Sequence, residues 1–211
     1  MVKIFDCLEN IAIPSILHQT NKNFEWIWLI DDKTPDDIKN RLVLLSEIYN
    51  ATIIFDKWIS PEGYGEGNSC GGDWVSKLQK KVKHNKLLVC TRYDVDDYIS
   101  SDFVDIVQKY ITDPRVCIDF KMRITIDEDK KLYLMRNTPP SPIVTLVEKT
   151  DRIKTPYCKP HYELSRDYKM KTLPNIVYAK TERKPDPSII IKKLEGTILE
   201  IGDFEEIKKR I

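Results

Sequence analysis

The first thirty residues change from helical to strand periodicity. Apolar side chains recur every three or four positions near the N-terminus, at Ile4, Phe5, Leu8 and Ile11. Pro14 stands where such a helix would bend, and a polar turn follows at residues 20–23. Residues 24–30 are rich in β-forming side chains and become almost continuously apolar, as in a strand covered on both faces. The pattern predicts a helix over residues 2–18 followed by a central strand.

Four further segments extend this order. Thr34 is followed by a proline and two acidic residues, as at the start of a helix, which we expect over about residues 35–49. β-prone segments at 51–55 and 87–91 predict two strands, with a helix at about residues 74–82 between them. Strands that alternate with helices over short connections pair in parallel and bind ligands outside their carboxyl ends. The first half of the chain therefore predicts an α/β fold around a mostly parallel sheet.

The second half of the chain has a weaker pattern. A helix is expected at about residues 103–111, and strands are expected at 116–126 and 131–135 on either side of a charged turn. Beyond residue 136, proline-rich segments mark loops, and residues 205–210 fit a short terminal helix.

The composition is that of an ordinary folded domain. With 211 residues, the chain is expected to form a single domain over residues 1–211. Its 34 Lys and Arg against 33 Asp and Glu give a net charge of +1, which argues against nucleic acid as a partner. No stretch approaches about 18 apolar residues, so no transmembrane segment is expected. The five cysteines have no close pair and no secretory signal is visible, which favours reduced thiols and a cytoplasmic location.

Three carboxylates gather directly after the strand expected at residues 87–91, at Asp94, Asp96 and Asp97. Negative charge at this density is costly beside an apolar strand unless a cation compensates it. Hard oxygen ligands suit Mg²⁺ or Mn²⁺, which complete their coordination with water and phosphate oxygens. The cluster predicts a metal site that takes a diphosphate. The alternative is a solvated acidic turn before the helix that begins near Ser100 or Ser101.

Other interpretations of these motifs fit less well. Tyr98 and Ile99 stand where a calcium-binding EF-hand needs an acid or amide and then a glycine. Tyr98 also occupies the position where phosphatases with an aspartyl nucleophile have threonine or valine. The glycine-rich residues 63–72 lack both a compact G-x-G-x-x-G and a G-K-[ST], so neither a dinucleotide fold nor a P-loop is supported. A phosphate-binding loop and a surface lid both remain open for this segment.

Four motifs in register carry a family resemblance: residues 13–20 (IPSILHQT), 23–26 (NFEW), 30–32 (IDD) and 92–97 (RYDVDD). In this order the chain resembles the glycosyltransferases of the GT-A fold. Within them it is similar to the rhamnosyltransferase group related to glycosyltransferase family 2. The resemblance covers about residues 4–110 and continues more faintly at 141–148. It implies a GT-A-like, Rossmann-like sheet flanked by helices, with a nucleotide-sugar half at 1–115 and an acceptor-side half at 116–211.

The resemblance also implies roles for individual residues. In this family the acids after the first matched strand hold the base and the ribose, which assigns that role to Asp31 and Asp32. The D-x-D signature places Asp94 near the ribose and Asp96 on a Mn²⁺ or Mg²⁺ ion. A histidine in the C-terminal half of some GT-A enzymes reaches the metal or the diphosphate. His161 is the candidate, and a structural role for this lone histidine is the alternative.

The catalytic base of the family is an acid near the acceptor, and it has no clear counterpart in this sequence. Glu148 and Asp151 are candidates because of their place in the chain. A second departure concerns the sheet, since such enzymes begin with a strand that contacts the nucleotide and here Met1 falls at the helix after it. We therefore expect a sheet without its usual first strand. Either residues 189–191 fill that place or the donor pocket is incomplete.

These features together predict a metal-dependent glycosyltransferase. The donor would be a nucleotide-diphosphate sugar, and the acceptor a hydroxyl of a glycan or another molecule. A carboxylate would remove the acceptor's proton as the hydroxyl attacks the anomeric carbon, and family resemblance favours inversion at that carbon. The alternative is a catalytically degenerate binding or assembly module of the same fold, which an incomplete donor pocket would favour.

Overall fold

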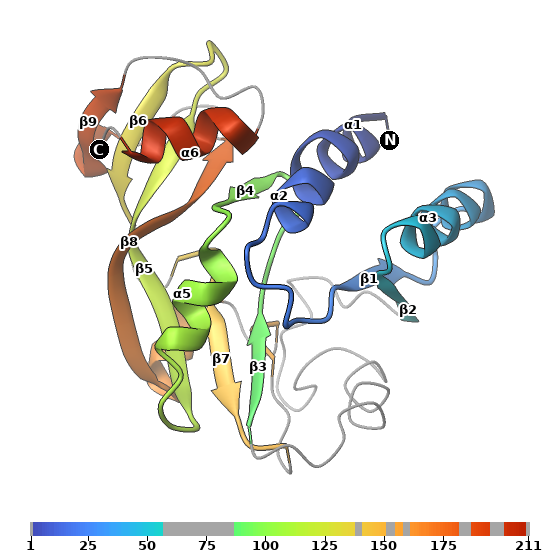
Figure 1. Ribbon diagram of the computed structural model, residues 1–211, viewed down its shortest axis with the longest axis horizontal. Helices are drawn as coiled ribbons and strands as arrows, with labels where there is room; N and C mark the ends of the chain where they lie inside the picture. Colours follow the sequence, from blue (N-terminus) through green and yellow to red (C-terminus); the bar gives the residue numbers. More distant parts are fainter. Residues whose placement is uncertain are drawn as a thin grey trace.

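The computed structural model describes most of the chain, namely residues 2–56, 87–137, 141–150, 155–157, 161–181, 187–194 and 201–209. Within these ranges a two-stranded sheet and a seven-stranded sheet are flanked by helices (Figure 1). No helix in this described part is long and apolar enough to cross a membrane. The helix expected at residues 74–82 and the glycine-rich segment 63–72 lie outside the described residues.

The predicted N-terminal helix is confirmed. It consists of a helix, a single π-helical turn and a second helix, α1 (Val2–Cys7), η1 (Leu8–Ala12) and α2 (Ile13–Leu17). Pro14 lies in the first turn of α2, directly after the π-helical turn, and its missing N–H removes one hydrogen bond of the continuous helix. The buried side of the segment packs against the strand and helix that follow it, through Phe5, Leu8, Ala12 and Ile13.

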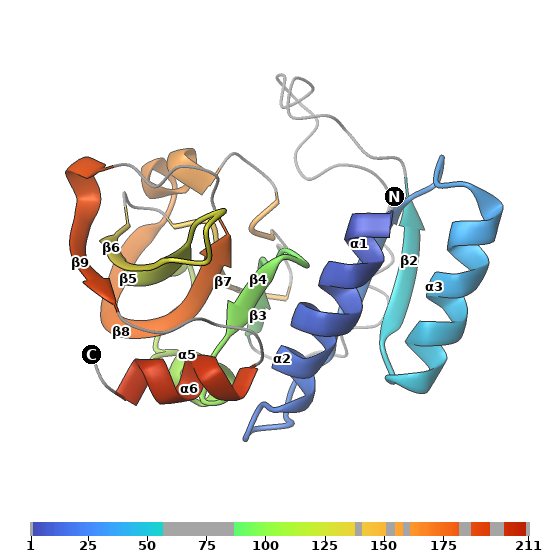
Figure 2. The same ribbon diagram turned by 90° about the horizontal axis from the view of Figure 1, so that it is seen from above.

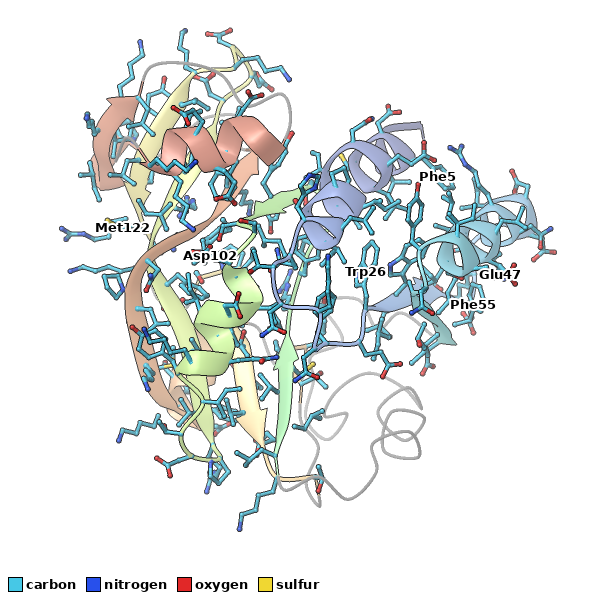
Figure 3. All side chains as sticks on the ribbon, in the orientation of Figure 1. Phe5, Trp26, Glu47, Phe55, Asp102 and Met122 are labelled. Atoms are coloured by element: carbon cyan, nitrogen blue, oxygen red, sulfur yellow. The ribbon has the colours of Figure 1, made fainter. Side chains whose placement is uncertain are left out.

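The first strand, helix and second strand form a parallel β-α-β unit, as expected. Strands β1 (Ile27–Asp31) and β2 (Thr52–Asp56) pair in parallel, and α3 (Asp36–Ile48) is the crossover between them. Figure 2 shows α1 and α2 between this unit and the larger sheet. Figure 3 shows Phe5 and Trp26 on the side of the N-terminal helices that faces α3.

The larger sheet contains seven strands, which are β3 (Leu88–Thr91), β4 (Asp97–Ile99), β5 (Val116–Ile126), β6 (Leu132–Arg136), β7 (Thr145–Glu148), β8 (Lys169–Thr181) and β9 (Ile190–Leu194). Five of them run side by side in the order β3-β7-β5-β6-β9, and β8 pairs with both β4 and β5. Of these pairings only β5 with β8 is parallel.

The expectation of a mostly parallel central sheet is therefore wrong for the larger sheet. Strands joined by a short turn pair in antiparallel fashion, whereas parallel neighbours need a long crossover. The link between β5 and β6 is such a turn, which is closed by a 2.8 Å hydrogen bond from the Lys131 N–H to Asp127 Oδ1. Strand β3 also leaves the predicted parallel series and pairs antiparallel with β7.

The proposal that residues 189–191 lie beside the first strand is wrong as well. Ile190 begins β9, which pairs with β6 at the far edge of the larger sheet, after the short helix η4 (Pro187–Ile189). Among the described strands, β1 pairs with β2 alone.

Helical elements cover both faces of the larger sheet. Cys117 and Ile118 are neighbours on β5, so their side chains point to opposite faces. Cys117 packs toward η3 (His161–Arg166) through Leu164, and Ile118 packs toward α5 (Phe103–Lys109). The C-terminal helix α6 (Ile201–Lys209), which confirms the expected terminal helix, buries Phe204 over one end of the sheet.

Candidate functional site

The acidic cluster lies where the sequence predicts it, directly after a strand. Strand β3 ends at Thr91, and a turn closed by a 3.1 Å bond from the Asp97 N–H to the Asp94 carbonyl follows it. Asp97 then begins the short strand β4, which the sequence did not reveal. Val95 is exposed at the tip of this turn.

Helix α2 and the residues directly after it anchor the acidic turn and the start of α5. The Ile99 N–H donates to Ser15 Oγ at 3.4 Å, and Gln19 Nε2 donates to the Ser100 carbonyl at 2.7 Å. Gln19 Oε1 also accepts a 3.1 Å bond from the Val104 N–H. Ser15 and Gln19 are buried and lie one helical turn apart, so they face the same side of the segment. These contacts give residues 13–20 a physical role, because they hold the backbone that follows the carboxylates.

The C-terminal helix holds the same backbone from another direction. Glu205 Oε1 accepts a hydrogen bond from the Ser101 N–H at 2.6 Å. Lys208 Nζ donates to Asp102, the residue labelled in Figure 3 that directly precedes α5. Burial raises the pKa of Asp102, but hydrogen bonds led by the one from Lys208 outweigh it and leave that pKa lowered. Helices from the two ends of the chain therefore converge on residues 97–105.

Asp97 is the most unusual carboxylate of the cluster. It is 1% exposed, and its Oδ1 has no hydrogen-bond partner among the described atoms. Burial raises its pKa well above 3.8, and the nearby charges of Asp94 and Asp96 raise it further. Lys180, its partner across the β4–β8 pair, opposes this effect only in part. A buried acid with an unsatisfied oxygen fits a site whose charge is completed by a cation.

Replacing Asp97 by asparagine should stabilise the protein in EDTA. The raised pKa means that the folded state holds the proton more tightly than the unfolded chain does, so native stability is lost as the pH rises from about 3.8 to the folded value. Asparagine keeps the shape of the side chain and removes its charge. The thermal midpoint of Asp97→Asn should therefore exceed that of the parent by a margin that grows over that pH range. A midpoint below that of the parent at every pH would contradict the electrostatic argument.

Asp94 has a basic partner that the sequence analysis did not single out. Arg92 donates from Nε and Nη2 to the two carboxylate oxygens of Asp94, at 3.2 and 3.0 Å. The Arg92 guanidinium also lies over the ring of Tyr157, with its carbon 5.4 Å from the ring centroid. The signal in the sequence was an arginine two residues before the D-x-D motif.

Asp31 ends strand β1 and Asp32 follows it, at the edge of the sheet where a ligand is expected. Asp31 Oδ1 accepts a 2.9 Å bond from the Lys33 N–H, and Asp32 Oδ1 is buried without a hydrogen-bond partner among the described atoms. Asp56 stands opposite Asp31 at the end of β2 and accepts the Asp32 N–H through its carbonyl at 2.8 Å. Its position at a strand end was the signal that could have identified Asp56.

Two tyrosines connect the parallel unit with the acidic turn. Tyr93 packs against the apolar cluster around Trp28 and donates its hydroxyl to the Asp97 carbonyl at 2.8 Å. Tyr157 packs against the cluster around Ile54 of β2 and supports Arg92. Burial raises the pKa of both tyrosines far above 10, so both stay neutral at ordinary pH. Sequence reasoning missed Tyr157 because the pattern after residue 136 is weak.

Glu148 lies away from the acidic turn. It is paired with Leu88 at the start of β3, whereas the turn follows Thr91 at the other end of that strand. The two ends of the strand are roughly 10 Å apart. Glu148 is buried and accepts a hydrogen bond from the Tyr168 hydroxyl. The structure therefore does not bring this candidate base together with Asp94 and Asp96.

The other two candidate site residues from the C-terminal half are Asp151 and His161. Asp151 lies outside the described residues. The structure places the backbone of His161 at the first residue of η3 and does not describe its side chain.

The acidic side chains of the turn allow a divalent cation to bind through only a few protein ligands. Among the described residues, no group of three or more His, Cys, Asp or Glu side chains is arranged to enclose a metal ion. Mg²⁺ and Mn²⁺ sites that bind phosphates commonly use one or two carboxylates and complete the shell with water and phosphate oxygens. The half-buried Asp96 and the orphaned Oδ1 of Asp97 fit that kind of site.

Comparison with known proteins defines the family. The chain belongs to the family described as "Putative rhamnosyl transferase", whose match covers residues 1–184. The family name suggests glycosyl transfer. The match includes the acidic turn, β1, β2 and β8 and ends before α6. A search of curated proteins finds no match.

Proposed function

We propose that this protein is a metal-dependent glycosyltransferase that moves a sugar from a nucleotide-diphosphate sugar to the hydroxyl of a glycan or another acceptor. The observation that carries the proposal is the buried Asp97, with an unsatisfied oxygen beside Asp94 and Asp96, in a chain of this family. A divalent cation would relieve the repulsion within this cluster, which Arg92 and Lys180 offset only in part.

The proposed donor site lies between the two acidic strand ends. Asp31 and Asp32 would accept hydrogen bonds from the base and ribose, because both follow the carboxyl end of a parallel strand. Asp94 would lie toward the ribose, and Asp96 would bind a Mn²⁺ or Mg²⁺ ion with Asp97 behind it. A cation bound there supplies positive charge against the diphosphate as it leaves. His161 is proposed to reach the metal or diphosphate, on the family resemblance alone.

The acceptor hydroxyl must lose a proton as it attacks the anomeric carbon, and a single displacement would invert that carbon. Asp151 keeps the proposed role of the base. Glu148 is the weaker candidate, because the Tyr168 hydroxyl and the β3–β7 pair hold it at the far end of β3.

A catalytically degenerate binding module is the second candidate. The observation that favours it is the separation of Glu148 from the acidic turn. Incubation with nucleotide sugars and Mn²⁺ distinguishes the two, since a glycosyltransferase slowly hydrolyses its donor without acceptor and a binding module only retains it.

A nucleoside diphosphate should stabilise the fold only when a divalent cation is present. Without the cation, the diphosphate and the carboxylates at Asp94, Asp96 and Asp97 repel each other. At a ligand concentration of about a hundred times Kd, the gain in unfolding free energy should be about 2.7 kcal/mol. Thermal midpoints with uridine, guanosine and thymidine diphosphates, each with Mn²⁺ or EDTA, measure this effect. An equal gain in EDTA would remove the metal from the proposal.

A further inference from the structure

Arg92 is fixed at the acidic turn from two directions. Its Nε and Nη2 donate to both oxygens of Asp94, which holds the guanidinium along one edge. Tyr157 lies against the guanidinium face, and the Arg92 N–H donates to the Val144 carbonyl at 3.0 Å, which fixes the backbone. The side chain remains 23% exposed, so an anion from solvent can reach it.

The charges around the turn indicate that Arg92 does more than neutralise Asp94. A diphosphate that enters here meets the carboxylates of Asp94 and Asp96, with Asp97 buried behind them, and a single divalent cation offsets only part of that repulsion. A guanidinium presents its donors as a planar fork that fits phosphate as well as carboxylate. The cation–π contact with Tyr157 lowers the entropy lost when the fork binds, because the group is already held in place.

We propose that Arg92 is a diphosphate-binding residue of this site. It neutralises Asp94 in the ligand-free protein and donates to the diphosphate once a divalent cation occupies the carboxylates. Tyr157 supports it through the ring that lies beneath the guanidinium. This inference rests on the proposed function, since it assigns one contact to the nucleotide-diphosphate donor.

A purely structural ion pair predicts a different result. If the Arg92–Asp94 pair only stiffened the turn, its loss would loosen the carboxylates and weaken metal and nucleotide binding together. If Arg92 binds phosphate, its loss has opposite effects on the two ligands. The affinity for Mn²⁺ rises, because a positive charge leaves the neighbourhood of the metal ligands, and the affinity for the nucleoside diphosphate falls.

The experiment is calorimetric titration of the full chain with Mn²⁺, and then with uridine, guanosine or thymidine diphosphate in saturating Mn²⁺. In Arg92→Gln we expect Mn²⁺ to bind roughly fivefold more tightly. The best-bound diphosphate of the parent should bind about tenfold more weakly or worse. Arg92→Lys keeps the charge and loses the fork, so its Mn²⁺ affinity should match the parent and its diphosphate affinity should lie between the other two. The matching monophosphate should lose less than the diphosphate in Arg92→Gln.

Two variants of Tyr157, the residue that supports Arg92, complete the test. Tyr157→Phe keeps the ring and should lose less diphosphate affinity than Tyr157→Leu, which removes it, with Mn²⁺ binding near that of the parent in both variants. Equal diphosphate affinity in Arg92→Gln, Arg92→Lys and the parent would overturn the assignment of Arg92 and leave the proposed function standing. A parallel loss of both ligands in Arg92→Gln would also overturn it. A parent that binds no nucleoside diphosphate with Mn²⁺ would overturn both proposals.

Discussion

Replacing Asp96 by asparagine is expected to remove metal-dependent nucleotide binding and to leave the fold intact. Asp96 is half-buried, and its charge raises the pKa of the neighbouring Asp97. Asparagine is similar in size and removes one of three mutually repelling charges, so stability without metal should stay equal to that of the parent or rise. Loss of even an outer-shell partner of a metal ligand costs about 10–100-fold in metal affinity, so loss of a ligand should cost at least tenfold.

Asp31→Asn is the matched control for this variant. Asp31 lies at the end of β1 and is proposed to contact the base or ribose, so its replacement should weaken nucleotide binding and leave Mn²⁺ binding near the parent's. Titration of Mn²⁺ and then of a nucleoside diphosphate into both variants shows the contrast. If Asp96→Asn binds both ligands like the parent, or fails to fold, the cluster is a structural turn and the metal assignment is wrong.

The largest effect on stability is expected for Phe204→Ala in the C-terminal helix. Phe204 is completely buried and packs in the cluster that contains Tyr98 of β4 and Leu132 of β6. Truncation of a buried phenylalanine to alanine costs about 3–5 kcal/mol, because apolar contacts are lost and a cavity remains. Since α6 lies beyond the family match and contacts the backbone after Asp97, the variant also tests whether this helix belongs to the cooperative core.

Leu44→Ala is the control for Phe204→Ala. Leu44 lies on α3 with 62% of its surface exposed, so its truncation should change stability by less than about 0.5 kcal/mol. Urea denaturation measures both variants, with the midpoint shifted and the slope unchanged if two-state unfolding is kept. A loss below about 1 kcal/mol for Phe204→Ala would mean that α6 unfolds separately from the sheet.

The sequence by itself determined the elements whose partners are close in the chain. Apolar spacing predicts the N-terminal helix and α3, and short connections predict the parallel pairing of β1 with β2, as the structure shows. It also placed Asp94, Asp96 and Asp97 together after a strand, because neighbours in sequence at a strand end stay neighbours in space.

The tertiary structure alone decided the partners that are far apart in sequence. Strand β8 escaped notice because Pro174 and several lysines interrupt its pattern, yet it pairs with both β4 and β5. Pro174 is tolerated because it lies where the register between β5 and β8 shifts, so its missing N–H breaks no regular ladder bond. Periodicity reports which faces of a strand are buried, not which strand lies beside it. The separation of Glu148 from the acidic turn follows from the pairing of β3 with β7. The contact between Tyr157 and Arg92 likewise joins residues far apart in the sequence, which no local pattern encodes.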